Sequence, residues 1–116
     1  MLIVDDHPSF RRVARELLVA RGYAVAREAA CGAEALAATE RLAPDAVLLD
    51  VRLGDDSGHD VARALSLLDD APAVLLVSVL DDADGDERAL ACGARGFVLK
   101  AGLAMADLGR FWPRAV

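Results

Sequence analysis

The sequence has few of the residues that several common kinds of site need. Its two cysteines, Cys31 and Cys92, stand far apart without Cys-x-x-Cys or Cys/His spacing, so we expect reduced thiols and neither a disulfide nor a zinc site. It has no glycine-rich GxGxxG or GxxxxGK[ST] segment, which excludes Rossmann and P-loop nucleotide sites. No apolar run approaches the roughly 18 residues of a membrane span, and the first residues show no signal-peptide pattern. We therefore expect a cytoplasmic protein without membrane contact.

Basic residues are scarce as well. Lys100 is the only lysine, the other twelve basic residues are arginine, and the net charge is −6. Because binding to nucleic acid phosphates needs a basic face, we do not expect this chain to bind DNA by itself. At 116 residues with a mean hydropathy of +0.32, the chain is expected to form one globular domain over residues 1–116.

Four short apolar runs each end in a polar residue. The runs cover 2–4, 46–49, 73–77 and 97–99, and the residues that follow them are Asp5 with Asp6, Asp50, Ser78 and Lys100. Short apolar runs bounded by turn residues are typical of buried strands. In open α/β sheets, ligands bind beyond the carboxyl ends of the strands, so these side chains are expected to meet at one edge.

Helical patterns separate these runs. We expect helices from Pro8 to Gly22, over 33–42, from an N-cap at Ser57, over 84–92, and a short last helix over 105–111 that ends near Pro113. A weak strand is expected over 23–29. This alternation predicts an α/β fold with a doubly wound, flavodoxin-like, five-stranded parallel sheet of order 2-1-3-4-5 and helices on both faces. In that order the crevice opens between strands one and three, which end at Asp5-Asp6 and Asp50.

The acidic residues and their partners suit phosphoryl transfer. Carboxylates held close together repel unless a cation lies between them, and Mg²⁺ prefers such oxygen ligands. Asp50 is the best candidate nucleophile because it stands alone, which leaves Asp5 and Asp6 to hold the metal. The Ser78 hydroxyl and the Lys100 ammonium can compensate phosphoryl oxygens. His7 and His59 lack a second ligand at metal spacing, and we expect both to be inert.

The same segments resemble a known family. LIVDDHPSFRR, AVLLDVRLGDDSG, AVLLVS and ACGARGFVLK are similar to the receiver domain of bacterial two-component response regulators. The first and last of these resemble most closely the NarL/LuxR type, in which a helix-turn-helix output domain follows.

The resemblance implies a role for each candidate residue. Asp50 would accept phosphate from a sensor histidine kinase, and Mg²⁺ would be bound by Asp5, Asp6, Asp50 and the main-chain carbonyl of Arg52. Ser78 would be the switch hydroxyl, Lys100 the lysine that pairs with the phosphate, and Phe97 the aromatic residue that turns inward. DNA would be contacted only through a separate output domain, and a homodimer could form through helix four, strand five and helix five.

Three features depart from the family pattern. Val79 follows the switch hydroxyl where the family has a small residue, and it could narrow the path to the phosphate. Ala101 follows Lys100 where the family commonly has proline, although a cis bond there costs about 2.5–4 kcal/mol without proline. The last helix is short, although it normally belongs to the output surface.

Two alternatives remain open at this point. One is a receiver-like module that dimerises or binds a partner without phosphorylation, which Val79 favours mildly. The other is an aspartate-nucleophile phosphatase, but that class expects a second acid two residues after the nucleophile, where this chain has Arg52. The chain would catalyse only its own phosphorylation and dephosphorylation, so it would be a signalling protein and not a metabolic enzyme.

Overall fold

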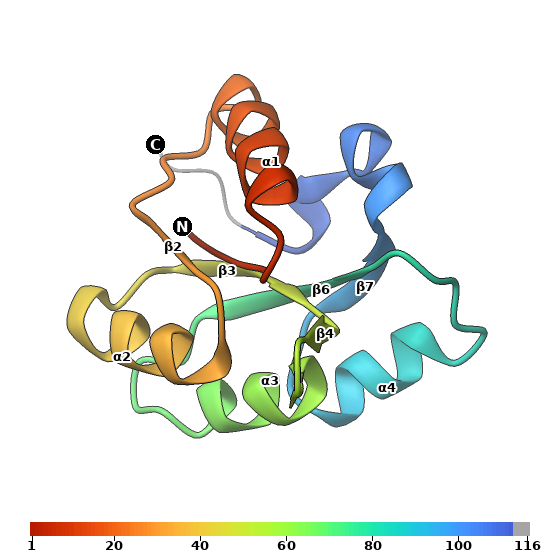
Figure 1. The fold of residues 1–116 in the computed structure, drawn as a ribbon. Helices are drawn as coiled ribbons and strands as arrows, with labels where there is room; N and C mark the ends of the chain where they lie inside the picture. Colours follow the sequence, from red (N-terminus) through yellow and green to blue (C-terminus); the bar gives the residue numbers. More distant parts are fainter. Residues whose placement is uncertain (113–116) are drawn as a thin grey trace.

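A five-stranded parallel sheet forms the centre of the protein (Figure 1). The computed structural model describes residues 1–112. The strands run in the order β2-β1-β3-β6-β7, with bounds Arg27–Ala29, Leu2–Val4, Ala46–Asp50, Ala73–Ser78 and Gly96–Leu99. This is the predicted order 2-1-3-4-5, because the two extra strands in the numbering form a separate hairpin. That hairpin, which the sequence did not predict, pairs β4 (Arg52–Leu53) with β5 (Asp56–Ser57).

Helices cover both faces of the sheet, as predicted. One face carries α1 and two 3₁₀ segments, and the other carries α2, α3 and α4 (Figure 1). The bounds are Pro8–Ala20 for α1, Gly32–Leu42 for α2, Gly58–Ser66 for α3 and Gly85–Ala91 for α4. None of the helices in the described residues is both long and apolar enough to cross a membrane.

The apolar strand residues divide between two cores because successive side chains point to opposite faces. In β3, Val47 and Leu49 pack with α2, α3 and α4, whereas Leu48 packs with α1 and Trp112. All three are fully buried. A strand buried on both faces is apolar throughout, and this is the reason why the runs were recognisable in the sequence.

Local signals set most of the helix ends. Pro8 opens α1, and Gly22 follows the end of that helix at a φ of 93°. The Ser57 side chain caps α3 by accepting a hydrogen bond of 3.4 Å from the amide of Asp60. The end of α4 is followed by Gly93 at a φ of 89°.

The second strand is shorter than predicted. Only Arg27–Ala29 pairs with β1. Tyr23 is instead drawn back to α1, because its amide donates to the carbonyl of Leu18 and its ring is buried against Trp112. These contacts take Tyr23 out of the line of the strand.

The predicted last helix over 105–111 is wrong. The chain forms two 3₁₀ segments, η1 (Lys100–Met105) and η2 (Leu108–Arg110), and the predicted end near Pro113 lies outside the described residues. A helix this short is marginal by itself. Here the Arg21 guanidinium also donates to two carbonyls near the start of this segment, to Ala104 at 2.9 Å and to Ala106 at 2.6 Å.

Candidate functional site

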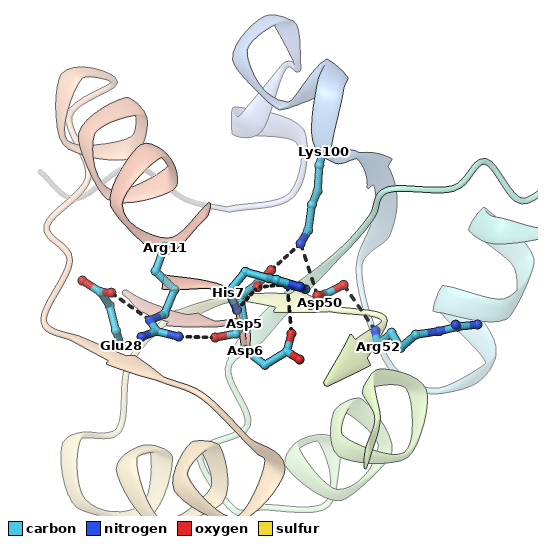
Figure 2. A network of polar contacts seen from close by, with 8 residues as sticks. All are labelled: Asp5, Asp6, His7, Arg11, Glu28, Asp50, Arg52 and Lys100. Carbon is cyan, nitrogen blue, oxygen red and sulfur yellow. Dashed lines mark hydrogen bonds and ion pairs between the residues drawn. The ribbon is translucent and has the colours of Figure 1, made fainter. Parts of the chain in front are cut away.

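The carboxyl ends of four strands meet at one edge of the sheet and form the candidate site (Figure 2). Asp5 and Asp6 follow β1, and Asp50 ends β3, its neighbour in the sheet. Ser78 ends β6, and Lys100 follows β7. The parallel pairing β1-β3-β6-β7 therefore brings to one edge side chains that are up to 95 residues apart in the chain.

Lys100 lies between two buried carboxylates. Its Nζ is 2.6 Å from Asp5 Oδ2 and 3.2 Å from Asp50 Oδ2. The Lys100 side chain is only 12% exposed, and its ammonium lies 4.2 Å from the centre of the Phe10 ring. The ion pairs and the cation–π contact fix the direction of this side chain.

Asp50 is placed in an unfavourable position for a charged group. Burial and, after it, the negative charge of Asp5 raise the pKa of Asp50, against the opposing effects of the Arg52 amide and of Lys100. The Arg52 amide donates to Asp50 Oδ1 at 3.2 Å, whereas the Arg52 side chain extends away from the carboxylate (Figure 2). Any additional cation near Asp50 would favour its ionised, nucleophilic form.

His7, expected to be inert, contacts both acidic neighbours. Its amide donates to Asp5 Oδ1 at 2.8 Å, and its Nδ1 lies 3.2 Å from that oxygen and 3.1 Å from Asp6 Oδ1. The imidazole Nδ1 thus lies close to both carboxylates. The only feature of the sequence that could have indicated this contact is that His7 directly follows the pair Asp5-Asp6.

The acidic residues fit a divalent cation. Asp5, Asp6, His7 and Asp50 each offer a ligand atom, and these atoms lie within 4.8 Å of one another. Asp6 Oδ1 is buried, and within the described residues it receives no hydrogen bond of good geometry, only the approach of His7. A buried carboxylate oxygen without a donor is suited to a hard cation that prefers oxygen.

An open cavity of about 330 Å³ gives access to these groups. It is lined by Asp6, His7, Asp50, Arg52, Gly54, Ser78, Val79, Leu80 and Lys100. The Ser78 hydroxyl accepts a hydrogen bond of 3.1 Å from the amide of Leu80. Val79 lines the same cavity with a largely exposed side chain. The peptide bond between Lys100 and Ala101 is trans, as are the others in residues 1–112.

Phe97 is half-buried and packs against α4. Its ring covers Gly85, the first residue of that helix, so closely that a Cβ atom on Gly85 would overlap the ring. Glycine at this position therefore makes room for the observed position of Phe97. No sequence pattern predicts this contact, since Gly85 alone is typical of a helix start.

Two further residues behind the acidic pair were missed by sequence reasoning. Arg11, on the first turns of α1, donates to the main-chain carbonyl of Asp5 at 2.6 Å and to Glu28 Oε1 at 3.1 Å. Figure 2 shows this guanidinium between Glu28 and Asp5. One partner follows β1 and the other lies on β2, so that only the folded structure reveals them.

The other candidates lie outside the site. Trp112 is buried, and its indole Nε1 donates to the carbonyl of Ala73 at 2.9 Å, which confirms that it closes the core. Cys31 and Cys92 are free thiols. His59 is not a member of the acidic cluster, and burial and then the charge of Arg88 lower its pKa.

The fold and the acidic edge of the sheet define a receiver domain. Residues 1–108 match the response regulator receiver domain family, and the chain belongs to that family. The relatives below show that it is of the NarL/LuxR type.

The chain is 40% identical over 102 residues to the nitrate/nitrite response regulator protein NarP of Escherichia coli K12, a match that covers 86% of this chain and 47% of NarP. It thus spans about half the length of this curated relative. A LuxR-family two-component response regulator from Aurantimonas sp. SI85-9A1 superposes with a TM-score of 0.83 at 32% identity, over 90% of this chain and 75% of that one. A response regulator from Burkholderia pseudomallei, crystallised with a phosphorylated aspartic acid, a calcium ion and citrate, gives a TM-score of 0.83 at 26% identity, over 97% and 65%.

Proposed function

We propose that Asp50 is the phosphoacceptor of this receiver domain, and that residues 1–116 form one such domain. The observation that carries the proposal is the position of Asp50, buried between Lys100 and the Asp5-Asp6 pair at the mouth of an open cavity. A carboxylate oxygen of Asp50 would attack the phosphorus of a phosphohistidine. The new O–P bond forms as the P–N bond breaks, and the leaving imidazole nitrogen keeps the electron pair.

Lys100 and Ser78 have separate roles in this reaction. Lys100 carries a positive charge directly beside Asp50, where it can pair with a phosphoryl oxygen. Because Ser78 Oγ accepts in its bond to the Leu80 amide, its own O–H remains a donor for a second oxygen. Ser78 would then move toward the phosphate, and Phe97 would respond as the switch residue.

Mg²⁺ is proposed as the cofactor. Asp5, Asp6, Asp50 and the main-chain carbonyl of Arg52 would hold it, and when bound it would neutralise charge on the carboxylates and the phosphoryl group. The close approach of the acidic ligand atoms, and the buried Asp6 Oδ1 that receives no hydrogen bond in the described residues, support this assignment.

The partners are proposed from the relatives. A sensor histidine kinase would supply the phosphoryl group in the cytoplasm, and a separate output domain would bind DNA. The phosphorylated domain would self-associate, or release its output domain, through the face of α4, β7 and η1. Two observations support this part of the proposal. NarP is a response regulator about twice as long as the matched region, and on the face named here the Phe97 ring packs closely on Gly85.

Labelling with acetyl phosphate tests the acceptor directly. The wild-type protein should gain one phosphoryl group by intact-mass measurement in the presence of MgCl₂ and none in EDTA. Asp50→Asn should gain none, whereas Asp55→Asn, an exposed carboxylate nearby, should be labelled like the wild type. Labelling that persists in Asp50→Asn would show that another residue is the acceptor.

A further inference from the structure

The Asp5 backbone is held by hydrogen bonds at both its amide and its carbonyl. Its amide donates to the carbonyl of Ala29 at 3.0 Å, and its carbonyl accepts from Arg11 at 2.6 Å. The first bond comes from β2 and the second from α1. The amide belongs to the Val4–Asp5 peptide and the carbonyl to the Asp5–Asp6 peptide, so the two bonds hold the peptide planes on either side of the Asp5 Cα.

Arg11 is in turn fixed by Glu28. One carboxylate oxygen of Glu28 accepts from Arg11 Nε at 3.1 Å, and the other accepts from Arg15 Nε at 2.7 Å. Arg15 also donates to the carbonyl of Val25 at 3.2 Å. The hydrogen bond and charge of Arg15, together with those of Arg11, lower the pKa of Glu28, so the carboxylate is ionised at neutral pH.

The guanidinium of Arg11 is suited to this position by its shape. Its planar fork bonds Glu28 through Nε and the Asp5 carbonyl through Nη1 at the same time, and the side chain is only 18% exposed. Lysine has the same charge but a single donor nitrogen, which cannot hold both partners in this geometry.

We propose that Arg11 is a positioning residue for the metal site, held in place by Glu28. It orients the peptide between Asp5 and Asp6, and through it the two carboxylates of Asp5 and Asp6 that would bind the cation. Groups behind the ligands of a metal typically change its affinity about 10–100-fold when they are removed. The inference rests on the proposed Mg²⁺ site.

The direction of the effect separates positioning from charge. Arg11→Met removes a positive charge close to a cation site, so that electrostatics alone would make Mg²⁺ bind more tightly. If Arg11 acts by positioning, the same substitution weakens Mg²⁺ binding. Arg11→Lys keeps the charge, and positioning predicts weaker binding here as well.

The experiment is a titration of the whole chain with MgCl₂, followed by amide chemical shifts around Asp50 and well below the melting temperature. The Mg²⁺ dissociation constant should rise about tenfold in Arg11→Met and several-fold in Arg11→Lys and Glu28→Gln. Arg12→Met is the matched control, because it removes the same charge from the next, exposed residue of α1 and should leave the constant unchanged.

The outcomes distinguish this inference from the proposed function. Unchanged or tighter binding in folded Arg11→Met, with or without a lower melting temperature, would overturn the positioning role. If Arg11→Met does not fold, unchanged binding in Arg11→Lys and Glu28→Gln would overturn it equally. A wild-type protein that does not bind Mg²⁺ at all would instead refute the proposed metal site.

Discussion

The ammonium of Lys100 lies closer to Asp5 than to Asp50, at 2.6 Å against 3.2 Å. Asp5 is fully buried, and Asp50 is almost so. One cation thus serves two buried carboxylates, of which one is the proposed phosphoacceptor and the other a proposed metal ligand. The stability of the sheet edge and its chemistry therefore depend on the same lysine.

Lys100→Met should destabilise the protein and the destabilisation should be partly reversed by Mg²⁺. Removing one member of a buried ion pair leaves uncompensated charge, which costs about 3–5 kcal/mol. We expect a loss near 3 kcal/mol in urea unfolding with EDTA and a smaller loss with 10 mM MgCl₂. An equal loss under both conditions would show that the cation does not compensate the carboxylates.

Asp50→Asn should stabilise the metal-free protein at neutral pH. A folded-state pKa raised above the usual 3.8 means that the folded state holds its proton more tightly than the unfolded chain does. The wild type therefore loses stability as the pH rises from about 4 through the folded-state pKa, and the asparagine variant does not. We expect a gain in the free energy of unfolding at pH 7 that disappears below pH 4. Urea unfolding of both proteins between pH 3 and 7 in EDTA shows whether the asparagine variant is the more stable of the two.

Removal of the metal should lower the melting temperature. A ligand that binds only the folded state stabilises it by mass action, by about 1.4 kcal/mol at ten times its dissociation constant. Thermal unfolding with and without 10 mM MgCl₂ should show this gain in the wild type and a smaller one in Asp6→Asn. Asp55→Asn, an exposed control, should behave like the wild type. The cluster would have to be reinterpreted if melting were indifferent to Mg²⁺.

Val79 should prolong the phosphorylated state. Hydrolysis needs a water molecule roughly in line with the O–P bond, and a β-branched side chain on the rim of the cavity narrows that approach. We expect Val79→Ala to lose phosphate several-fold faster, as followed by intact mass after removal of acetyl phosphate. Equal decay rates would mean that Val79 does not limit access.

Gly85→Ala should displace the Phe97 ring. The added methyl group would overlap the ring, and overpacking of this kind costs about 1–3 kcal/mol. The double variant with Phe97→Ala should lose less than the sum of the two single losses, since the clash is gone. Additive losses in this cycle would show that the two residues do not interact. Shifts at α4 on phosphorylation, blunted by Ser78→Ala, would connect the contact to the switch.

Local sequence patterns determined much of this protein. Runs such as 46–49 are apolar because a parallel strand is buried on both faces. The polar residues that follow such runs lie at one edge of the sheet, because all parallel strands point the same way. The grouping of Asp5, Asp50 and Lys100 was therefore predictable from positions along the chain. Ser57 and Gly22 marked helix ends for equally local reasons, because caps and left-handed turns act within a few residues.

Tertiary contacts decided the rest. Arg21, which follows α1, donates to the carbonyls of Ala104 and Ala106 near the start of the predicted last helix, and no local pattern shows this contact. In the same way, Tyr23 packs on Trp112 and is not part of the second strand. The hydrogen bond from Arg11 to the Asp5 carbonyl joins residues from different elements, and so does the packing of the Phe97 ring on Gly85. Such contacts depend on the distance and angle between packed elements, which only the folded chain defines.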